Sequence, residues 1–186
     1  MNEIDKTIKP TKLLWVDLEM TGLDPSEHVI IEVAVLITDF NFKTLAKYEA
    51  IISQPEEKIR NMNEWSAIQH AKSGLIDKIR NNGKTEKQVI IEIVDLIKNN
   101  FGDEPAILAG NSIYNDRKFI EKWWPEVASL LHYRMLDVTS FKILMENKLT
   151  DKFQKNDNHR ALDDIGASIK ELEFYLDNLS KISEKP

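Results

Sequence analysis

The sequence predicts an α/β fold in which helices flank one mixed central sheet. Three segments rich in Val, Ile and Leu come first and are joined by short connections. Such connections are typical of antiparallel strands, because parallel strands need a crossover of about a dozen residues or more. Helical and strand-like segments then alternate, which is typical of a layered α/β arrangement. With 186 residues, 42% of them hydrophobic and 30% charged, the chain has the size and composition of one globular domain.

Each of the first three strands is predicted by its local pattern. Residues 13–19 are apolar except for two carboxylates, and turn-forming residues follow at 21–25. Residues 28–40 contain a run of Val and Ile, and residues 47–52 form a weaker candidate. We expect these three strands to form an antiparallel meander.

Helices are predicted after Pro55. Apolar residues recur at helical spacing over residues 65–79, and Gly74 is expected to divide this pattern into two helices. Thr85 to Gln88 form a capping-box pattern before an apolar run, which predicts a helix over residues 86–99.

The second half of the chain alternates between the two structure types. We expect strands at residues 106–110 and 133–137, and helices at 116–124, 125–131, 139–147 and 161–179. The last helix has an apolar stripe made of Leu162, Ile165, Ile169, Leu172, Leu176 and Leu179. Residues 12–180 are therefore predicted to form one domain, between a flexible leader at 1–11 and a tail at 181–186.

Composition excludes several classes of protein. The chain has no cysteine, which excludes disulfides, thiolate nucleophiles and Cys-bound metals. No uncharged apolar run approaches the roughly 18 residues that span a bilayer, and the N-terminus does not resemble a signal peptide, so we expect a cytoplasmic protein without a membrane partner. The net charge of −6 denies a long nucleic acid its usual row of phosphate contacts, so any nucleic-acid substrate should be short.

Carboxylates recur at three places where a site could form. Asp17 and Glu19 are two residues apart on a predicted strand, so both leave the same face, with Cα atoms about 6.6 Å apart. Asp116 follows the strand at residues 106–110, and strand ends are where α/β proteins build sites. Alternatively, the strand pair is a solvated charged face, and Asp116 is a carboxylate favoured by a helix N-terminus.

The third place is the start of the last helix. His159 precedes Asp163 and Asp164 by about one turn, and Asp164 lies nearer the border of the apolar stripe than Asp163, which makes it the better ligand candidate. An Asp pair that only favours the helix N-terminus is the alternative.

Together these segments supply four carboxylates and one imidazole. Oxygen ligands suit Mg²⁺ or Mn²⁺ better than zinc, so we expect a site for two divalent ions, about 3.5 to 4 Å apart, that hydrolyses a phosphodiester. His159 is the natural general base for the attacking water.

Three motifs resemble those of the DEDD exonuclease superfamily, histidine subclass, and most closely those of the oligoribonuclease family. They are residues 17–23, residues 110–117 and the His-x-Ala-x-x-Asp pattern of residues 159–164. The resemblance implies a ribonuclease-H-like exonuclease fold and 3′→5′ hydrolysis of very short oligoribonucleotides, of about two to five nucleotides and especially dinucleotides, to nucleoside 5′-monophosphates. Asp17, Glu19, Asp116 and Asp164 would be the metal ligands and His159 the base.

The resemblance also implies roles in substrate binding. Leu23 and Trp65 resemble residues that wedge or stack the terminal bases, and His70 lies in the same substrate-facing segment. The residues that resemble a cap around the 5′ phosphate are Ser112, Arg134 and Thr139. Tyr133 matches a tyrosine that reaches the partner protomer's site, which implies a homodimer. The alternatives are core packing for Leu23 and Trp65, a dimer surface for Tyr133 and Arg134, and an ordinary helix-face histidine for His70.

Two other functions stay open at the level of sequence. One is a proofreading-type subunit that removes nucleotides from DNA 3′ ends, and the other is an RNA-binding module of nuclease fold without catalysis. The complete set of acidic motif residues argues against the module without catalysis, and the exoribonuclease is the leading interpretation.

Overall fold

The computed structural model describes residues 9–149, 152–154 and 161–183, and the predicted base His159, most of the predicted leader and the last residues of the predicted tail lie outside them. Five strands in the described ranges form one sheet of order β3-β2-β1-β4-β5. Their bounds are β1 Lys12–Met20, β2 Ile30–Asp39, β3 Thr44–Ile51, β4 Ala106–Gly110 and β5 Leu131–Asp137. The strands β1, β2 and β3 are antiparallel neighbours, and β4 and β5 run parallel to β1. The predicted mixed sheet and the predicted meander are both confirmed.

The helices of the described ranges follow the predicted order. Three short helices come after β3, namely α1 Glu56–Arg60, α2 Glu64–Lys72 and α3 Leu75–Asn82. Then come α4 Glu86–Phe101, α5 Tyr114–Trp123, α6 Pro125–Ala128, α7 Val138–Glu146 and α8 Ala161–Ser183. Gly74 separates α2 from α3 with a φ of 69°, a left-handed conformation that glycine adopts without strain. The additional helix α1 was not predicted, because its five residues are too few to show a period.

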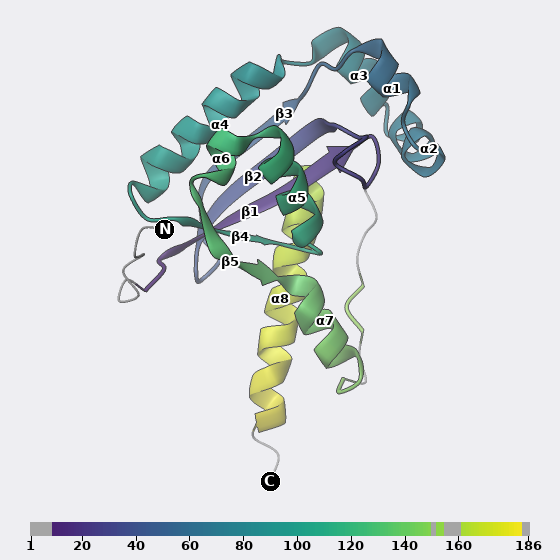
Figure 1. The fold of residues 1–186 in the computed structure, drawn as a ribbon. Coiled ribbons are helices and arrows are strands. Elements are labelled where there is room, and N and C mark those ends of the chain that lie inside the picture. Colours follow the sequence, from purple (N-terminus) through teal and green to yellow (C-terminus); the bar gives the residue numbers. More distant parts are fainter. Residues whose placement is uncertain (1–8, 150–151, 155–160, 184–186) are drawn as a thin grey trace.

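Two helical layers cover the sheet (Figure 1). On one face, α4, α5 and α6 pack against Leu14, Val16 and Leu18 of β1. On the other face, α7 and α8 pack against Leu13 and Trp15. Because successive residues of a strand face opposite sides, the odd-numbered positions of β1 face α8. Asp17 and Glu19 continue this odd-numbered series toward the start of α8.

The close approach of β4 to β1 depends on Gly110. A Cβ at this position would lie 2.9 Å from the Val16 carbonyl oxygen, which is closer than side chains come to a backbone oxygen. Trp15 pairs with Ala109 at the same edge, so the end of β4 is held directly beside the strand that carries Asp17.

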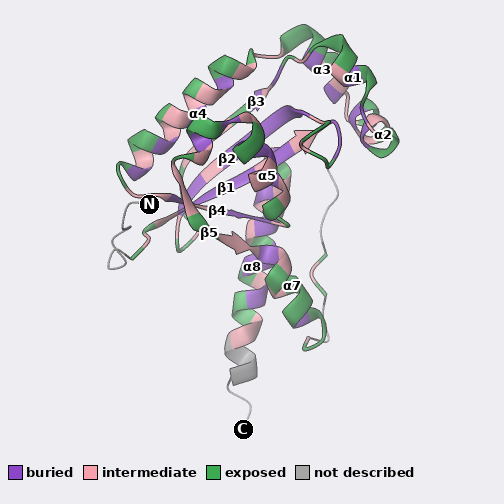
Figure 2. Ribbon diagram, in the orientation of Figure 1, coloured by how far each residue is buried: buried purple, intermediate pink, exposed green. Residues whose placement is uncertain are grey.

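The buried face of α8 differs from the predicted stripe at one turn. Leu176 is exposed, whereas Tyr175 is 4% exposed and packs in the core with Ile165 and Leu172. Positions 161, 165, 168, 172 and 175 alternate in steps of four and three, which keeps them on one face of an α-helix. Figure 2 shows a similar division across the molecule, with mostly buried central strands β1, β2 and β4 and exposed outer faces on the surrounding helices. In the described part of the chain, no helix is both long enough and apolar enough to cross a membrane.

Candidate active site

Three of the four carboxylates predicted to bind metal lie together at one end of β1. Asp17 and Glu19 of β1 and Asp164 of α8 each have an oxygen within 4.8 Å of the others. All three side chains are half-buried. Two elements far apart in the sequence therefore bring three negative charges into one small volume. Such a set suits a hard divalent cation, which prefers oxygen ligands and neutralises the repulsion among them.

The first turn of α8 selects between its two aspartates. Asp163 is exposed, whereas Asp164 is half-buried and belongs to the carboxylate group. Ala161 and Ile165 are buried against the sheet, which turns position 164 toward β1. Asp164 rather than Asp163 thus faces the carboxylates of β1, on the side of α8 that the helical spacing predicted.

Asp116 approaches the same strand from the opposite layer. Its side chain is 8% exposed, and its Oδ1 accepts a hydrogen bond from the Leu18 backbone N–H at 2.9 Å. Leu18 lies between Asp17 and Glu19, so Asp116 adjoins the carboxylate group without belonging to the set of oxygens within 4.8 Å. Burial raises the pKa of the Asp116 carboxyl to about 7, opposed in part by the hydrogen bonds it accepts. The loss of hydration is thus the larger effect at this carboxyl.

A fifth carboxylate, Glu32, lies beside this site and was not singled out from the sequence. Glu32 of β2 pairs in register with Glu19 and is 4% exposed. Cross-strand partners share a face of the sheet, so Glu32 places a further carboxyl group on the side of Glu19. The available signal was a charged residue inside a run of Val and Ile, which is unusual for a buried strand.

The helix α2 is attached directly to the end of β1. The Asn63 backbone N–H donates to the Thr21 carbonyl oxygen at 2.9 Å, and His70 Nε2 lies 3.0 Å from the Met20 carbonyl oxygen. A carbonyl only accepts, so the hydrogen of the His70 ring is on Nε2. Its Nδ1 then lies toward Glu19, 3.9 Å from Oε2. His70 is 4% exposed and joins α2 to the carboxylate strand, so a contact with substrate stays a prediction.

Leu23 and Trp65 are two large apolar residues that are exposed near this attachment. Leu23, in the loop after β1, is 66% exposed, and Trp65, in the first turn of α2, is 65% exposed. Core packing is therefore not the role of either side chain. Exposed Leu and Trp side chains on two linked segments are suited to contact flat apolar groups such as nucleobases.

The turn after β4 brings two of the predicted phosphate-binding residues together. Ser112 has a φ of 51°, and its backbone N–H donates to Thr139 Oγ1 at 2.9 Å and to Asp137 Oδ1 at 3.0 Å. The Ser112 and Thr139 hydroxyl oxygens are 3.1 Å apart. Asp137 also caps α7 by accepting from the Thr139 N–H at 2.9 Å. Asp137 was missed as a site residue, although an Asp two residues before Thr139 is a signal for a helix N-cap.

Tyr133 and Arg134 project from β5, the edge strand of the sheet. Tyr133 is 61% exposed, its ring stacks on His132 with centroids 4.5 Å apart, and the Arg134 guanidinium carbon lies 5.2 Å from the ring centroid. Burial lowers the pKa of His132, and the positive charges of Arg134 and Arg117 lower it further. The structure thus presents an aromatic and a cationic side chain on an open edge.

Comparison with known proteins agrees with this arrangement. Residues 14–172 match the family model of the RNase T exonucleases. An oligoribonuclease of Aeromonas hydrophila is 37% identical over 180 residues, which cover 95% of this chain and 99% of the relative. An oligoribonuclease of Wigglesworthia glossinidia brevipalpis is 42% identical over 177 residues, covering 92% of this chain and 94% of the relative.

Solved structures resemble the chain in fold. The zinc-bound exonuclease I of E. coli in complex with single-stranded DNA superposes with a TM-score of 0.64 at 12% identity, covering 93% of this chain and 43% of that one. Exonuclease I of Methylocaldum szegediense superposes with a TM-score of 0.60 at 14% identity, covering 88% and 40%. The present chain thus spans less than half of those longer proteins, and the likeness establishes the exonuclease fold.

Proposed function

Since the chain belongs to the RNase T exonucleases, and within them to the oligoribonuclease family of 3′→5′ exoribonucleases, we propose that it hydrolyses very short RNA, especially dinucleotides, to nucleoside 5′-monophosphates. The observation that carries this proposal is the convergence of Asp17, Glu19 and Asp164 within 4.8 Å. The acidic net charge of −6 adds to it, because a long strand would find little general attraction on this protein.

The metal site in this proposal consists of Asp17, Glu19, Asp116 and Asp164. Two bound Mg²⁺ or Mn²⁺ ions would lower the pKa of the attacking water and stabilise the leaving oxygen. The chain itself holds the four carboxylates on the strand β1 and on the helices α5 and α8, which pack against the sheet. His159, just before α8, takes the proton of the water in this scheme.

The two ends of a dinucleotide would be held by different parts of the chain. Leu23 and Trp65 offer apolar surface for the bases, and stacking of this kind contributes roughly 1 to 3 kcal/mol per base. The Ser112 and Thr139 hydroxyls, with the Arg134 guanidinium, would bind the terminal 5′ phosphate. The Ser112 N–H donates hydrogen bonds to both Asp137 and Thr139, which supports this role. These two bonds keep the Ser112 and Thr139 hydroxyls in place before substrate binds.

A homodimer would complete the site in this proposal. Tyr133 is exposed on an edge strand and stacked on His132, so it is available to a partner. In the dimer it would reach the partner protomer's substrate.

The function is tested by digestion of 5′-labelled RNA. We would incubate an RNA dinucleotide, an RNA 20-mer and a DNA 20-mer with Mg²⁺, with Mn²⁺ or with a chelator. The expected result is cleavage of the dinucleotide with either metal and none with the chelator. Preference for the DNA 20-mer would support a proofreading role instead, and binding without any cleavage would support an RNA-binding module.

A further inference from the structure

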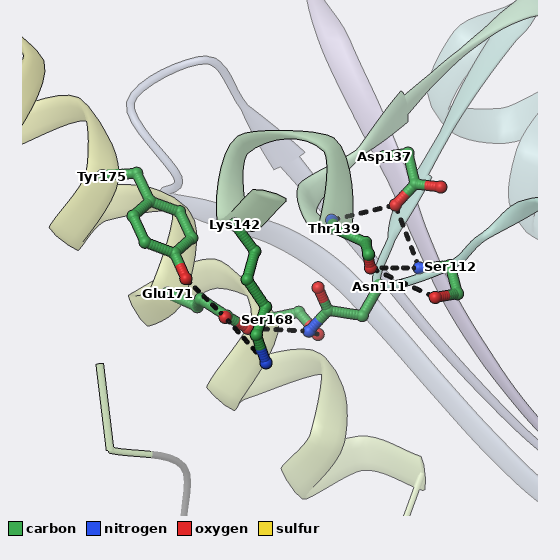
Figure 3. Close-up of polar contacts among 8 residues, drawn as sticks. All are labelled: Asn111, Ser112, Asp137, Thr139, Lys142, Ser168, Glu171 and Tyr175. Carbon is green, nitrogen blue, oxygen red and sulfur yellow. Dashed lines mark hydrogen bonds and ion pairs between the residues drawn. The ribbon is translucent and has the colours of Figure 1, made fainter. Parts of the chain in front are cut away.

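A buried polar network joins α8 to the end of β4 (Figure 3). Its centre is Glu171, which is 3% exposed. Glu171 Oε1 accepts from the Tyr175 hydroxyl at 2.8 Å, and Oε2 accepts from Asn111 Nδ2 at 3.0 Å. The Lys142 ammonium, 4.0 Å from Oε1, is the cation beside it. Burying a carboxylate costs several kcal/mol of folding free energy unless such bonds compensate it. Packing alone therefore does not account for a glutamate at this position.

The orientation of the Asn111 amide follows from its partners. Its Nδ2 donates both to Glu171 Oε2 and to Ser168 Oγ, each at 3.0 Å. A carboxylate only accepts, and the Ser168 hydroxyl hydrogen is already donated to the Asp164 carbonyl oxygen at 2.9 Å. Both partners therefore require the NH₂ group of Asn111. Its Oδ1 is buried without a hydrogen-bond partner among the described residues, which shows how strongly the two acceptors decide the orientation.

The network reaches the metal site through one residue. A serine that donates to the carbonyl four residues earlier is ordinary in a helix. Here the same Ser168 also accepts from Asn111, the residue directly after β4, so the carbonyl of Asp164 is linked to a neighbouring element. Glu171 lies two helical turns after Asp164 on the same face, so its bond to Asn111 fixes both the rotation and the axial position of α8.

The other end of the network reaches the proposed phosphate cap. Asn111 is followed directly by Ser112, whose N–H is held by Asp137 and Thr139 (Figure 3). The dipeptide of Asn111 and Ser112 thus connects the helix that carries Asp164 with the turn that carries the hydroxyl pair.

We propose that Glu171 is a positioning residue for the metal-binding carboxylate of Asp164. Through Asn111 and Ser168 it holds the first turns of α8 at the place where Asp164 meets Asp17 and Glu19. The inference rests on the proposed metal-dependent function. Residues that orient a metal ligand from behind typically contribute ten- to hundred-fold to metal affinity, which sets the size of the expected effect.

The test compares Mn²⁺ binding by variants of the full chain, measured by isothermal titration calorimetry after metal removal. Glu171→Met keeps the length of the side chain but removes both acceptors, and we expect roughly ten- to hundred-fold weaker Mn²⁺ binding. Glu171→Gln should stay within about three-fold of wild type, because its Oε1 still accepts from Asn111 and its amide donates to the Tyr175 oxygen. With saturating Mn²⁺, the KM for an RNA dinucleotide should be unchanged in both.

The matched control is Glu92→Met in α4. Glu92 also accepts from a tyrosine, Tyr48, and from Lys84, each at 2.6 Å, but it joins α4 to β3 away from the carboxylate group. Its loss should lower the melting temperature without changing the affinity for Mn²⁺. Equal weakening in this variant would overturn the inference, because a general loss of stability would then explain the effect.

Ser168→Ala provides a second variant in case Glu171→Met does not fold. It removes only the hydroxyl between Asn111 and the Asp164 carbonyl, and it should weaken Mn²⁺ binding in the same direction. Wild-type affinity in every variant that folds, or equal weakening by Glu171→Gln and Glu171→Met, would overturn the positioning role. Failure of the wild type itself to bind Mn²⁺ would overturn the proposed function, and the inference with it.

Discussion

Replacing Asp116 by Asn should stabilise the metal-free protein while removing a proposed metal ligand. The carboxyl is buried, which raises its pKa from 3.8 to about 7. Each pKa unit is worth 1.36 kcal/mol, so the ionised carboxylate destabilises the fold by up to about 4 kcal/mol at pH 8. Asn keeps the Oδ1 that accepts from the Leu18 N–H but carries no charge.

The sign of this effect depends on pH. Below about pH 3.8 the carboxyl is protonated in both the folded and the unfolded state, so it contributes nothing. Between about pH 4 and 7 the unfolded state releases its proton first, so the wild type loses stability as the pH rises. Above pH 7 the penalty is constant. The advantage of Asp116→Asn should therefore grow from near zero at pH 4 to a plateau above pH 7.

The assay is thermal unfolding followed by circular dichroism in the presence of EDTA, from pH 4 to pH 8. We expect Asp116→Asn to recover about 2 kcal/mol or more of the destabilisation that the ionised carboxylate causes at pH 8. For a chain of this size, this raises the melting temperature by at least about 4 °C. Asp95→Asn, an exposed carboxylate of α4, is the control and should change little. A pH-independent difference, or a lower melting temperature of Asp116→Asn at pH 8, would show that burial of the Asp116 carboxylate does not destabilise the fold.

Three further predictions concern catalysis and assembly. Asp164→Ala should abolish hydrolysis while circular dichroism shows an intact fold, because it removes a ligand position and relieves repulsion with Asp17; a wild-type rate would contradict the assignment. His159→Ala should lower kcat by roughly 10² to 10⁴ with Mn²⁺ affinity largely kept; an equal loss of metal affinity would identify His159 as a ligand. Tyr133→Ala should lower kcat/KM more than the melting temperature, and sedimentation should show a dimer; a fully active wild-type monomer at micromolar concentration would exclude the composite site.

The strands, and the face of its own element on which each carboxylate lies, were predictable because both follow from local periodicity. Asp17 and Glu19 are two residues apart on a strand, which alone places them on one face. The helical spacing of α8 separated Asp164 from Asp163 in the same way, and the structure agrees. These arguments need no knowledge of which elements pack together.

Contacts between distant elements could not be predicted in this way. The bond between Asn111 and Glu171 joins residues 60 positions apart, and a Glu on a helix is by default a solvated residue. The burial of His70 depends on how α2 docks against the Met20 carbonyl, and the exposure of Leu176 depends on the exact rotation of α8. Each of these depends on tertiary packing, which a pattern within one segment does not record.

The most direct test of the proposed function is the dependence of kcat/KM on RNA length. We would measure it for 5′-phosphorylated RNAs of two, three, five, seven and twenty nucleotides with saturating Mn²⁺, in wild type and in Arg134→Ala. A chain with a net charge of −6 offers a long strand few phosphate contacts, and the proposed cap of Ser112, Thr139 and Arg134 would close on a 5′ phosphate two nucleotides from the chain end. We expect the highest kcat/KM for the dinucleotide, a steep fall beyond about five nucleotides, and a weaker length dependence in Arg134→Ala. A flat or rising profile in the wild type would contradict this expectation.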